Sequence, residues 1–251
     1  MPAALRAHPE LIRLPRVGGH RVAQLHLCAA ALTPNVQTDF AHAPRFYTIP
    51  LVIPAIVLAA GKSTRMGRPK AMLPLDGGDT FLARIVRTFV EAGVEDVVVV
   101  VGHDADAIVT SLADADAAVS RARFVDNPDY EQGQLSSLLA GLKVVDRPGV
   151  VAVLVTLVDV PLVSAATVRA VIDRYHQTHA PIVRPVQGDQ HGHPVLIDRK
   201  LFDAFRHADP ATGAKPIIRA NVSLAGDVVV DDTGAFADAD TPDDYRKMIA
   251  G

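Results

Sequence analysis

The chain has 251 residues, 49% of them hydrophobic and 21% charged, which is long and apolar enough for one large α/β domain with a full core. Its net charge of −3 argues against nucleic-acid binding through a generally basic surface. A single cysteine excludes an intramolecular disulfide framework, and because no apolar run reaches about 18 residues we expect no membrane span and a cytoplasmic protein.

Residues 1–50 show no persistent hydrophobic period. Prolines interrupt any helix at positions 2, 9, 15, 34, 44 and 50. The first 20 residues contain arginines but no clean apolar core, which is unlike a secretory signal. We therefore expect a poorly ordered N-terminal extension over residues 1–50 and one domain over residues 51–251. A start-site artefact and a strap packed on the domain are the alternatives for the extension.

The domain opens with an apolar segment that runs into a loop rich in glycine and cations. Residues 53–60 read Ile-Pro-Ala-Ile-Val-Leu-Ala-Ala, which suits a strand buried on both faces of a parallel sheet. Small residues and cations then alternate from Gly61 to Lys70. Backbone N–H groups and positive charge at the carboxyl end of a strand suit a polyphosphate, so we interpret this loop as a triphosphate site. A surface turn that happens to be basic is the alternative.

The spacing in this loop excludes other familiar motifs. Five residues separate Gly61 from Gly67 and an arginine follows, whereas a Walker A loop has four residues between its glycines and then a lysine. The dinucleotide fingerprint G-x-G-x-x-G is absent, and Ser63 lacks the following glycine of a nucleophile elbow.

Downstream, helix-like and strand-like segments alternate. Paired apolar residues that recur every four positions predict a helix over residues 80–93, and residues 96–102 resemble a second buried strand. The next predicted elements are a short helix at 104–113, a strand at 122–125, a loop at 127–133, a helix around 135–142, a strand at 149–157 and a helix capped by Ser164. This alternation, repeated about four times, predicts a doubly wound, mostly parallel α/β sheet.

The last third of the chain is more mixed. Strands at 181–186 and 194–197 are expected to flank a polar turn at 187–193, and helices are expected at 200–208 and 215–220. A strand at 227–230 precedes a terminal helix at 242–250, with Thr241 as its cap and Pro242 in its first turn. An insertion that resembles a hairpin would make the sheet mixed, with an acceptor-side pocket between its halves.

Two acidic segments are candidates for a metal site. Asp159 directly follows the most apolar strand, where a buried carboxylate is costly unless it is paired. At the carboxyl end of a strand it could hold Mg²⁺ beside a triphosphate, whereas a helix cap or a salt bridge is the structural alternative. Asp238 and Asp240 precede the terminal helix, and one of them could complete the site.

Five segments in the same order give a specific resemblance. Residues 58–70 read L-A-A-G-x-S-x-R-M-G-x-x-K, which resembles the signature of the MobA-like nucleotidyltransferases, and within them most closely the molybdenum cofactor cytidylyltransferases. The other matching segments are N-P-D-Y-x-x-G-x-x-x-S from residue 127, D-x-P from residue 159, G-H-P from residue 192 and D-T-P-D-D from residue 240. The resemblance spans residues 53–250 and implies a Rossmann-like nucleotidyltransferase fold.

The resemblance also implies site residues. Nucleotide binding would involve Leu58, Ala59, Ala60, Gly61, Ser63, Arg65, Lys70, Asn127, Gly133 and Ser137. Within that set Arg65 would clamp the β- and γ-phosphates and Lys70 would reach the α-phosphate, so that these two and Asp159 form the catalytic group. The remaining roles are the binding of Mg²⁺ by Asp159 and Asp240, with Asp238 as a weaker candidate, and the lining of the acceptor half by Gly192, His193 and Pro194.

The reaction implied by the resemblance is transfer of CMP from CTP to the phosphate of molybdopterin carrying molybdenum, with release of pyrophosphate. Ala60 and Arg68-Pro69 stand where guanylyl-transferring relatives carry glycine and an acidic residue, which favours cytidine. The family also implies transient contact with a molybdoenzyme or its chaperone. Transfer to a sugar or polyol phosphate and a nucleotide-binding accessory protein without turnover stay open. For Tyr130, loop packing and nucleotide contact stay equally open.

Overall fold

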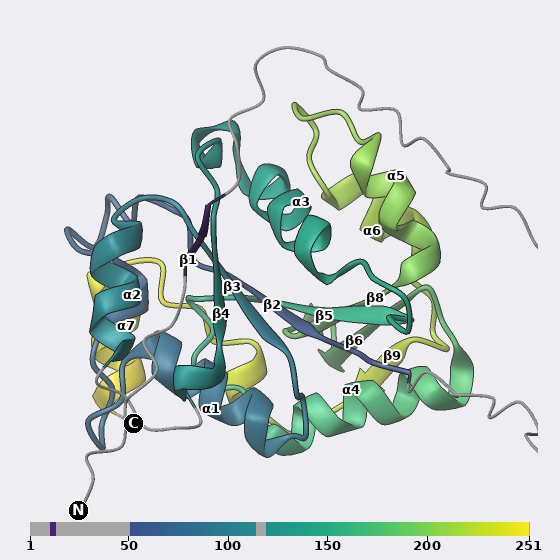
Figure 1. Cartoon of the computed structure of the whole chain (residues 1–251). Coiled ribbons are helices and arrows are strands. Elements are labelled where there is room, and N and C mark those ends of the chain that lie inside the picture. The colour runs from purple at the N-terminus through teal and green to yellow at the C-terminus, as the bar shows by residue number, and fades with distance from the viewer. Residues whose placement is uncertain (1–10, 14–50, 114–118, 251) are drawn as a thin grey trace, which may run out of the picture.

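The structure is a computed structural model of the chain (Figure 1). It describes residues 11–13, 51–113 and 119–250. Of the expected N-terminal extension it describes only Leu11–Arg13, which form strand β1. The remainder of residues 1–50 lies outside the described residues, so its order stays a prediction. Within the described ranges, no helix is long and apolar enough to cross a membrane.

One mixed sheet organises the domain, in the order β1-β4-β3-β2-β5-β8-β6-β7, with β9 paired to β6. The pairs from β1 through β5 are parallel, whereas β8 is antiparallel to both β5 and β6. The strands are β2 (Ala55–Leu58), β3 (Val97–Val101), β4 (Arg123–Asp126), β5 (Ala152–Leu157), β6 (Ile182–Gln187), β7 (Gln190–His191), β8 (Val195–Asp198) and β9 (Asp227–Val229). The predicted doubly wound, mostly parallel but mixed α/β sheet is confirmed.

Helices cover both faces of this sheet (Figure 1). On one face lie α3 (Gln134–Val145), α5 (Phe202–Arg206) and α6 (Lys215–Asn221). On the other face lie α1 (Phe81–Glu91), α2 (Ala105–Ala113) and α4 (Ala165–Thr178). The C-terminal helix α7 (Pro242–Ala250) packs on a small hydrophobic cluster at the start of α1. Short 3₁₀ turns are η1 (Lys70–Met72), η2 (Val119–Arg121), η3 (Tyr130–Gln132), η4 (Arg199–Leu201) and η5 (Thr233–Ala235).

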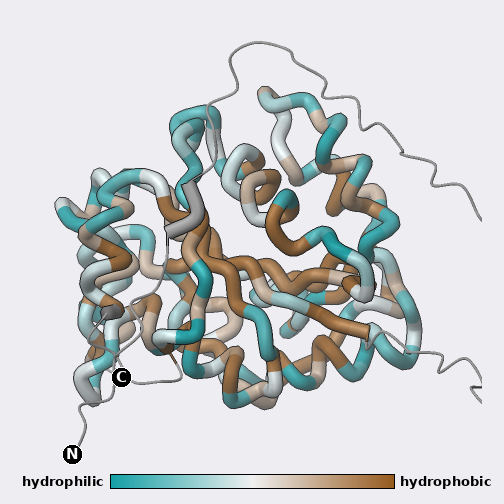
Figure 2. The backbone as a smooth tube through the Cα atoms, in the orientation of Figure 1, coloured by the Kyte–Doolittle hydropathy of each residue, from teal (hydrophilic) through white to brown (hydrophobic). Residues whose placement is uncertain are grey.

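The alternation of side chains along β2 explains its continuous apolar sequence. Ile56 and Leu58 join the core beneath α3 and α5, whereas Ala55 and Val57 join the core beneath α1 and α4. Because both faces are covered, a polar residue at any of these positions would be buried without a partner. Figure 2 shows the result, with hydrophobic residues concentrated in the sheet and hydrophilic ones along the outer sides of the helices.

Helix α3 approaches β2 closely at Gly141. A Cβ at this position would lie 2.7 Å from Cγ2 of Ile56, so only glycine allows this separation. The helix follows the loop that leaves β4, and its first turn therefore lies at the carboxyl end of the strands. The close approach of Gly141 to Ile56 fixes the position of the start of α3 relative to the end of β2.

The structure differs from the predicted elements mainly after residue 187. The predicted polar turn at 187–193 contains strand β7, which pairs with the end of β6. The predicted helix at 200–208 is divided into η4 and α5, and Asp198 caps the start of η4 by accepting a hydrogen bond from the Lys200 N–H at 2.8 Å. Both differences leave the edges of the sheet irregular and its centre as predicted.

Candidate active site

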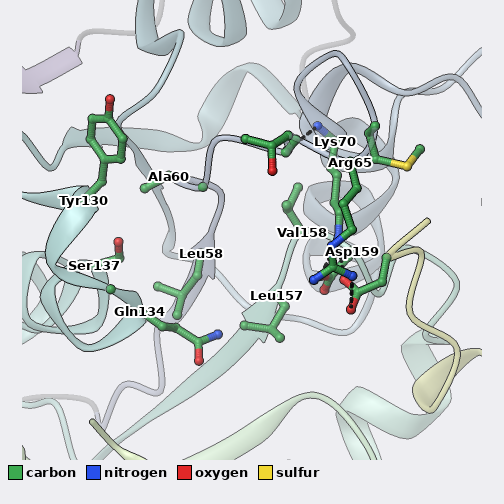
Figure 3. A pocket seen from close by; sticks show the side chains of 16 residues that line it. Leu58, Ala60, Arg65, Lys70, Tyr130, Gln134, Ser137, Leu157, Val158 and Asp159 are labelled. Atoms are coloured by element: carbon green, nitrogen blue, oxygen red, sulfur yellow. Dashed lines mark hydrogen bonds and ion pairs between the residues drawn. The ribbon is translucent and has the colours of Figure 1, made fainter. Parts of the chain in front are cut away.

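A cavity of about 370 Å³ opens at the carboxyl ends of β2 and β5 (Figure 3). From β2 the chain runs to β3 and β4 on one side and then returns to β5 on the other side. The strand order therefore reverses between β2 and β5, which is where open α/β sheets bind ligands. Leu58 and Leu157, the last residues of these two strands, both line the cavity.

Hydrogen bonds within the loop after β2 hold its shape. The Ala59 N–H donates to the Val100 carbonyl oxygen at 2.8 Å and extends the pairing with β3. Ser63 has a φ of 50°, and its Oγ accepts a hydrogen bond from the Lys70 N–H at 3.1 Å. This bond closes the loop and fixes the backbone from which the Lys70 side chain projects.

Lys70 joins the two carboxylates predicted to bind metal. Its Nζ donates to Asp159 Oδ2 at 3.0 Å and to Asp240 Oδ1 at 2.7 Å. Arg65 lies on the far side of Asp240, with Nη1 3.8 Å from Oδ2. The Lys70 and Asp159 side chains are only 12% and 18% exposed, whereas Arg65 is 69% exposed. The lysine and Asp159 are thus sheltered, and Arg65 stands at the mouth of the cavity.

Burial and ion pairing act in opposite directions on Lys70. Burial disfavours its ammonium, but the hydrogen bonds and charges of Asp240 and Asp159 outweigh that cost and raise the pKa of Lys70. The hydrogen bond from Lys70 in turn lowers the pKa of Asp240. Lys70 and Asp240 are therefore both charged at neutral pH.

Backbone contacts bring Asp240 to Asp159 from a distant part of the chain. The Ala239 N–H donates to the Asp159 carbonyl oxygen at 3.0 Å. Helix α7 starts two residues after Asp240, and its cap is reciprocal: the Thr241 N–H donates to Asp244 Oδ2 at 2.9 Å while the Asp244 N–H donates to Thr241 Oγ1 at 3.2 Å. The predicted cap at Thr241 is confirmed, and the packing of α7 against the start of α1 anchors Asp240.

The side chains that line the other end of the cavity are neutral. Tyr130, Gln134 and Ser137 lie together there, away from Lys70 and Asp159 (Figure 3). Gln134 and Ser137 come from the first turn of α3, so the positive end of the helix dipole adjoins the cavity. Tyr130 lines the cavity and also packs beside His103, with ring centroids 6.0 Å apart. Tyr130 therefore contacts a neighbouring loop and faces the cavity as well.

Asn127 supports the neutral end without lining it. The residue is 3% exposed, and its Nδ2 donates to Ser136 Oγ at 2.9 Å and to Ser137 Oγ at 3.0 Å. Its Oδ1 accepts a hydrogen bond from the Asp129 N–H at 3.1 Å. The whole amide is thus used within the protein, and it fixes the orientation of Ser137 at the cavity wall.

Gly192, His193 and Pro194 lie outside the cavity lining. The His193 N–H donates to the Ala235 carbonyl oxygen at 2.8 Å, and a Cβ at Gly192 would lie 2.4 Å from the same oxygen. Burial lowers the pKa of His193 in spite of the nearby charge of Asp159, so the imidazole is neutral at pH 7. The segment is tightly packed near Asp159, and its role toward an acceptor stays a prediction.

Asp159 and Asp240 fit a magnesium ion whose remaining ligands come from a bound nucleotide and water. Asp159 Oδ1 is buried and has no hydrogen-bond partner among the described residues, so its lone pairs are available to a cation. Throughout the residues that the structure describes, no group of three or more His, Cys, Asp or Glu side chains is arranged so that it could hold a metal ion. Mg²⁺ beside nucleotides commonly takes one or two carboxylates plus phosphate oxygens and water, which matches Asp159 and Asp240.

Most of the predicted site residues meet in this cavity. Its lining includes Leu58, Ala60, Gly61, Ser63, Arg65, Lys70, Gly133, Ser137, Asp159 and Asp240. It omits Ala59, which is buried in the core, and Asn127. The lining residues that the sequence did not indicate are Thr64, Met66, Gln134, Leu157 and Val158. Three of them could have been found from their neighbours in the sequence. Leu157 and Val158 directly precede Asp159, and Gln134 lies one helical turn before Ser137.

Comparison with known proteins agrees with this geometry. A family model described as the MobA-like NTP transferase domain matches residues 55–225. Nicotine blue oxidoreductase of Paenarthrobacter nicotinovorans is 30% identical over 210 residues, which cover 78% of this chain and 96% of that protein. The bifunctional protein GlmU of Sinorhizobium fredii is 28% identical over 199 residues, which cover 76% of this chain but only 42% of that relative.

Solved structures extend the likeness. Rv0371c from Mycobacterium tuberculosis H37Rv superposes with a TM-score of 0.68 at 28% identity, covering 81% of this chain and 100% of that one. Its complex with manganese gives 0.64 at 26% identity, covering 80% and 100%. Molybdopterin-guanine dinucleotide biosynthesis protein A from Archaeoglobus fulgidus gives 0.58 at 17% identity, covering 79% and 97%, which shows the fold alone. Because the family model matches more than half of the residues of this chain, the chain belongs to the MobA-like NTP transferase family.

Proposed function

We propose that the protein is a Mg²⁺-dependent nucleotidyltransferase that moves CMP from CTP to the phosphate of molybdopterin carrying molybdenum and releases pyrophosphate. Membership of the family supports nucleotidyl transfer, and the choice of nucleotide, metal and acceptor is the proposal. The observation that carries the proposal is that the two ends of the cavity differ in charge. One end gathers Lys70, Arg65 and two carboxylates, and the other gathers neutral side chains around Tyr130.

This difference in charge matches a nucleoside triphosphate lying along the cavity. The base and ribose would lie beside Tyr130 and Ser137, and the phosphates would extend toward Arg65 and Lys70. A volume of about 370 Å³ falls within the range of small-molecule sites. Ala60 lines the cavity with a methyl group, and this narrowing supports a pyrimidine over a purine.

The proposed transfer needs positioning and charge more than proton chemistry. An oxygen of the acceptor phosphate attacks the α-phosphorus of CTP and forms a new P–O bond. The bond from the α-phosphorus to the oxygen bridging the β-phosphate breaks, and pyrophosphate leaves with that electron pair. The attacking phosphate is already anionic, so no strong general base is required. Lys70 at the α-phosphate and Arg65 at the β- and γ-phosphates would offset the charge that develops.

Asp159 and Asp240 would hold the metal. When bound, a divalent ion supplies positive charge that polarises the phosphoryl oxygens and stabilises the leaving pyrophosphate. The unpartnered Oδ1 of Asp159 supports this assignment. The manganese complex of Rv0371c, a relative at 26% identity, supports a divalent metal in this fold.

The acceptor is proposed to enter beside Gly192–Pro194. The charge of Asp159 acts on His193, whose neutral imidazole donates Nδ1–H to the Val155 carbonyl oxygen at 3.4 Å and would accept one hydrogen bond at Nε2. Transfer of the product to a molybdoenzyme or its chaperone, in the cytoplasm, completes the proposal.

Pyrophosphate release tests this function. Each of the four nucleoside triphosphates is supplied with Mg²⁺, with and without molybdopterin carrying molybdenum. We expect release from CTP only when molybdopterin is present. Release with a sugar or polyol phosphate instead would move the reaction to that acceptor, and tight CTP binding without release for any acceptor would identify an accessory protein.

One relative is named an oxidoreductase and is matched over almost its whole length, so a redox assay belongs beside this test. The same preparation is incubated with reduced nicotinamide cofactors and their oxidation is followed by absorbance. We expect no consumption, since the dinucleotide fingerprint is absent from the sequence. Cofactor oxidation without pyrophosphate release would replace the transferase proposal.

A further inference from the structure

Lys70 fills the position that the proposed function assigns to a metal. A magnesium ion bound to both Asp159 and Asp240 would lie about 2.0–2.1 Å from one oxygen of each. The Lys70 ammonium already lies 3.0 Å from Asp159 Oδ2 and 2.7 Å from Asp240 Oδ1. An ion bound between these two oxygens would collide with it. While the ammonium keeps its bonds to Asp159 Oδ2 and Asp240 Oδ1, a metal cannot take these same two oxygens.

We propose that Lys70 closes the metal position until a nucleoside triphosphate draws its ammonium away, so that metal binding depends on nucleotide. This inference rests on the proposed function, because it takes Asp159 and Asp240 as the metal ligands. It adds a ligand exchange in which Lys70 passes from two carboxylates to phosphate oxygens.

The bridge from the Lys70 ammonium to Asp159 and Asp240 is favourable without a ligand. Two carboxylates that approach one point repel each other unless a cation lies between them, and Lys70 provides that cation. A metal arriving alone would have to displace an ammonium whose side chain is only 12% exposed and leave it without an anionic partner. Leaving a sheltered charge unpaired is costly, which disfavours metal binding on its own.

A triphosphate supplies what the displaced ammonium needs. The Lys70 backbone is held by Ser63, but its side chain can rotate about four bonds inside the same cavity that Arg65 lines. The ammonium can thus exchange carboxylate oxygens for phosphate oxygens while the backbone stays in place. Charge stays balanced, because the phosphates gain the lysine as the carboxylates gain the metal. Nucleotide and metal would then each strengthen the binding of the other by the same factor.

The test measures Mn²⁺ binding to the full chain without nucleotide, by electron paramagnetic resonance of the unbound ion. Wild type is compared with Lys70→Met and with the matched control Arg65→Met. Both variants remove one positive charge near Asp240, but only Lys70 bridges the two carboxylates. We expect Lys70→Met to bind Mn²⁺ at least about tenfold more tightly than wild type and Arg65→Met to stay within about threefold. Adding Asp159→Asn to Lys70→Met should abolish the gain.

A gain in Lys70→Met no larger than in Arg65→Met would overturn the inference, because loss of charge alone would then explain it. A gain that survives Asp159→Asn would also overturn it, since the ion would be bound elsewhere. Circular dichroism checks folding, and Lys70→Gln replaces Lys70→Met if that variant does not fold. The proposed function is scored separately: a protein that releases pyrophosphate but shows no gain refutes only the closing role of Lys70. A gain in a protein that releases none supports the metal position and refutes the transferase.

Discussion

Replacing Asp159 with asparagine keeps the shape of the side chain and removes its charge, so it separates a catalytic role from a structural one. Asp159 Oδ2 accepts the hydrogen bond from Lys70 at 3.0 Å, and the buried Oδ1 has no partner in the part of the chain that the structure describes. The hydrogen bond that holds the segment 239–240 beside Asp159 runs from the Ala239 N–H to the Asp159 carbonyl oxygen. The substitution leaves this backbone bond unaffected. We expect the fold to persist and turnover to be lost.

The expected change in stability is a difference between two similar contributions. Losing the charge-assisted bond to Lys70 costs about 1.5–3 kcal/mol, while Lys70 keeps its bond to Asp240. Removing a buried charge whose second oxygen is unpaired recovers about 1–3 kcal/mol. The net change in the free energy of unfolding is therefore within about 2 kcal/mol, or a shift in Tm of at most about 8 °C. The kinetic loss is larger, because losing about 4 kcal/mol of charge stabilisation lowers kcat about 1,000-fold.

Two measurements on the same preparation decide between the roles. Pyrophosphate release from CTP with molybdopterin reports turnover, and thermal unfolding followed by circular dichroism reports stability. Asp243→Asn is the matched control, since this exposed carboxylate at the start of α7 does not line the cavity and should leave turnover unchanged. Activity of Asp159→Asn within tenfold of wild type would remove the residue from the mechanism. A stability loss above about 4 kcal/mol would make its role structural.

Three further changes test the parts of the structure that support the site. Asn127→Ala removes the amide that orients two serines of α3, and we expect a loss of about 2–3 kcal/mol in urea denaturation and a higher KM for CTP. Gly141→Ala would improve helix propensity by about 1 kcal/mol, but contact with Ile56 costs about 1–3 kcal/mol, so unfolding should become easier. The Lys70–Asp240 pair should add stability that falls away below the ordinary aspartate pKa and again above the ordinary lysine pKa, and Asp240→Asn should flatten the acid side of the stability curve.

Each of these expectations has an opposite result that would count against the structure. A KM for CTP that is unchanged in Asn127→Ala would mean that this residue does not support the neutral end of the cavity, where the base and ribose are proposed to lie. A Gly141→Ala protein more stable than wild type would mean that α3 does not approach β2 as closely as described. An acid limb that is the same in wild type and Asp240→Asn would mean that the ion pair does not contribute to stability.

The centre of the fold was predictable because its information is local. Strands such as β3 are covered on both faces, so their sequences are continuously apolar, and amphipathic helices between them leave few alternatives to a parallel sheet. The loop after β2 was predictable for a similar reason, since its glycines and cations adjoin the strand end that carries ligands. The edge beyond β8 was less predictable, because β8 lies between β5 and β6 in the sheet although it follows both in the chain.

The contacts that make the site depend on long-range packing and were only partly visible in the sequence. The family resemblance implied that Asp159 and Asp240 belong together, and the structure joins them through Lys70. That the lysine bridges both carboxylates could not be derived from spacing, because it depends on where α7 packs. The inward role of Asn127 was missed for the same reason, since a buried amide and a ligand-binding amide have the same local sequence.

A crystal structure with Mg²⁺ and a non-hydrolysable CTP analogue tests the central claim most directly. The account expects the triphosphate at the charged end of the cavity, in contact with Arg65 and with a Lys70 ammonium that has left the carboxylates. The metal should lie between Asp159 and Asp240, and the base should lie near Tyr130. Phosphates bound elsewhere, or a Lys70 still joined to both carboxylates beside a bound nucleotide and metal, would contradict it.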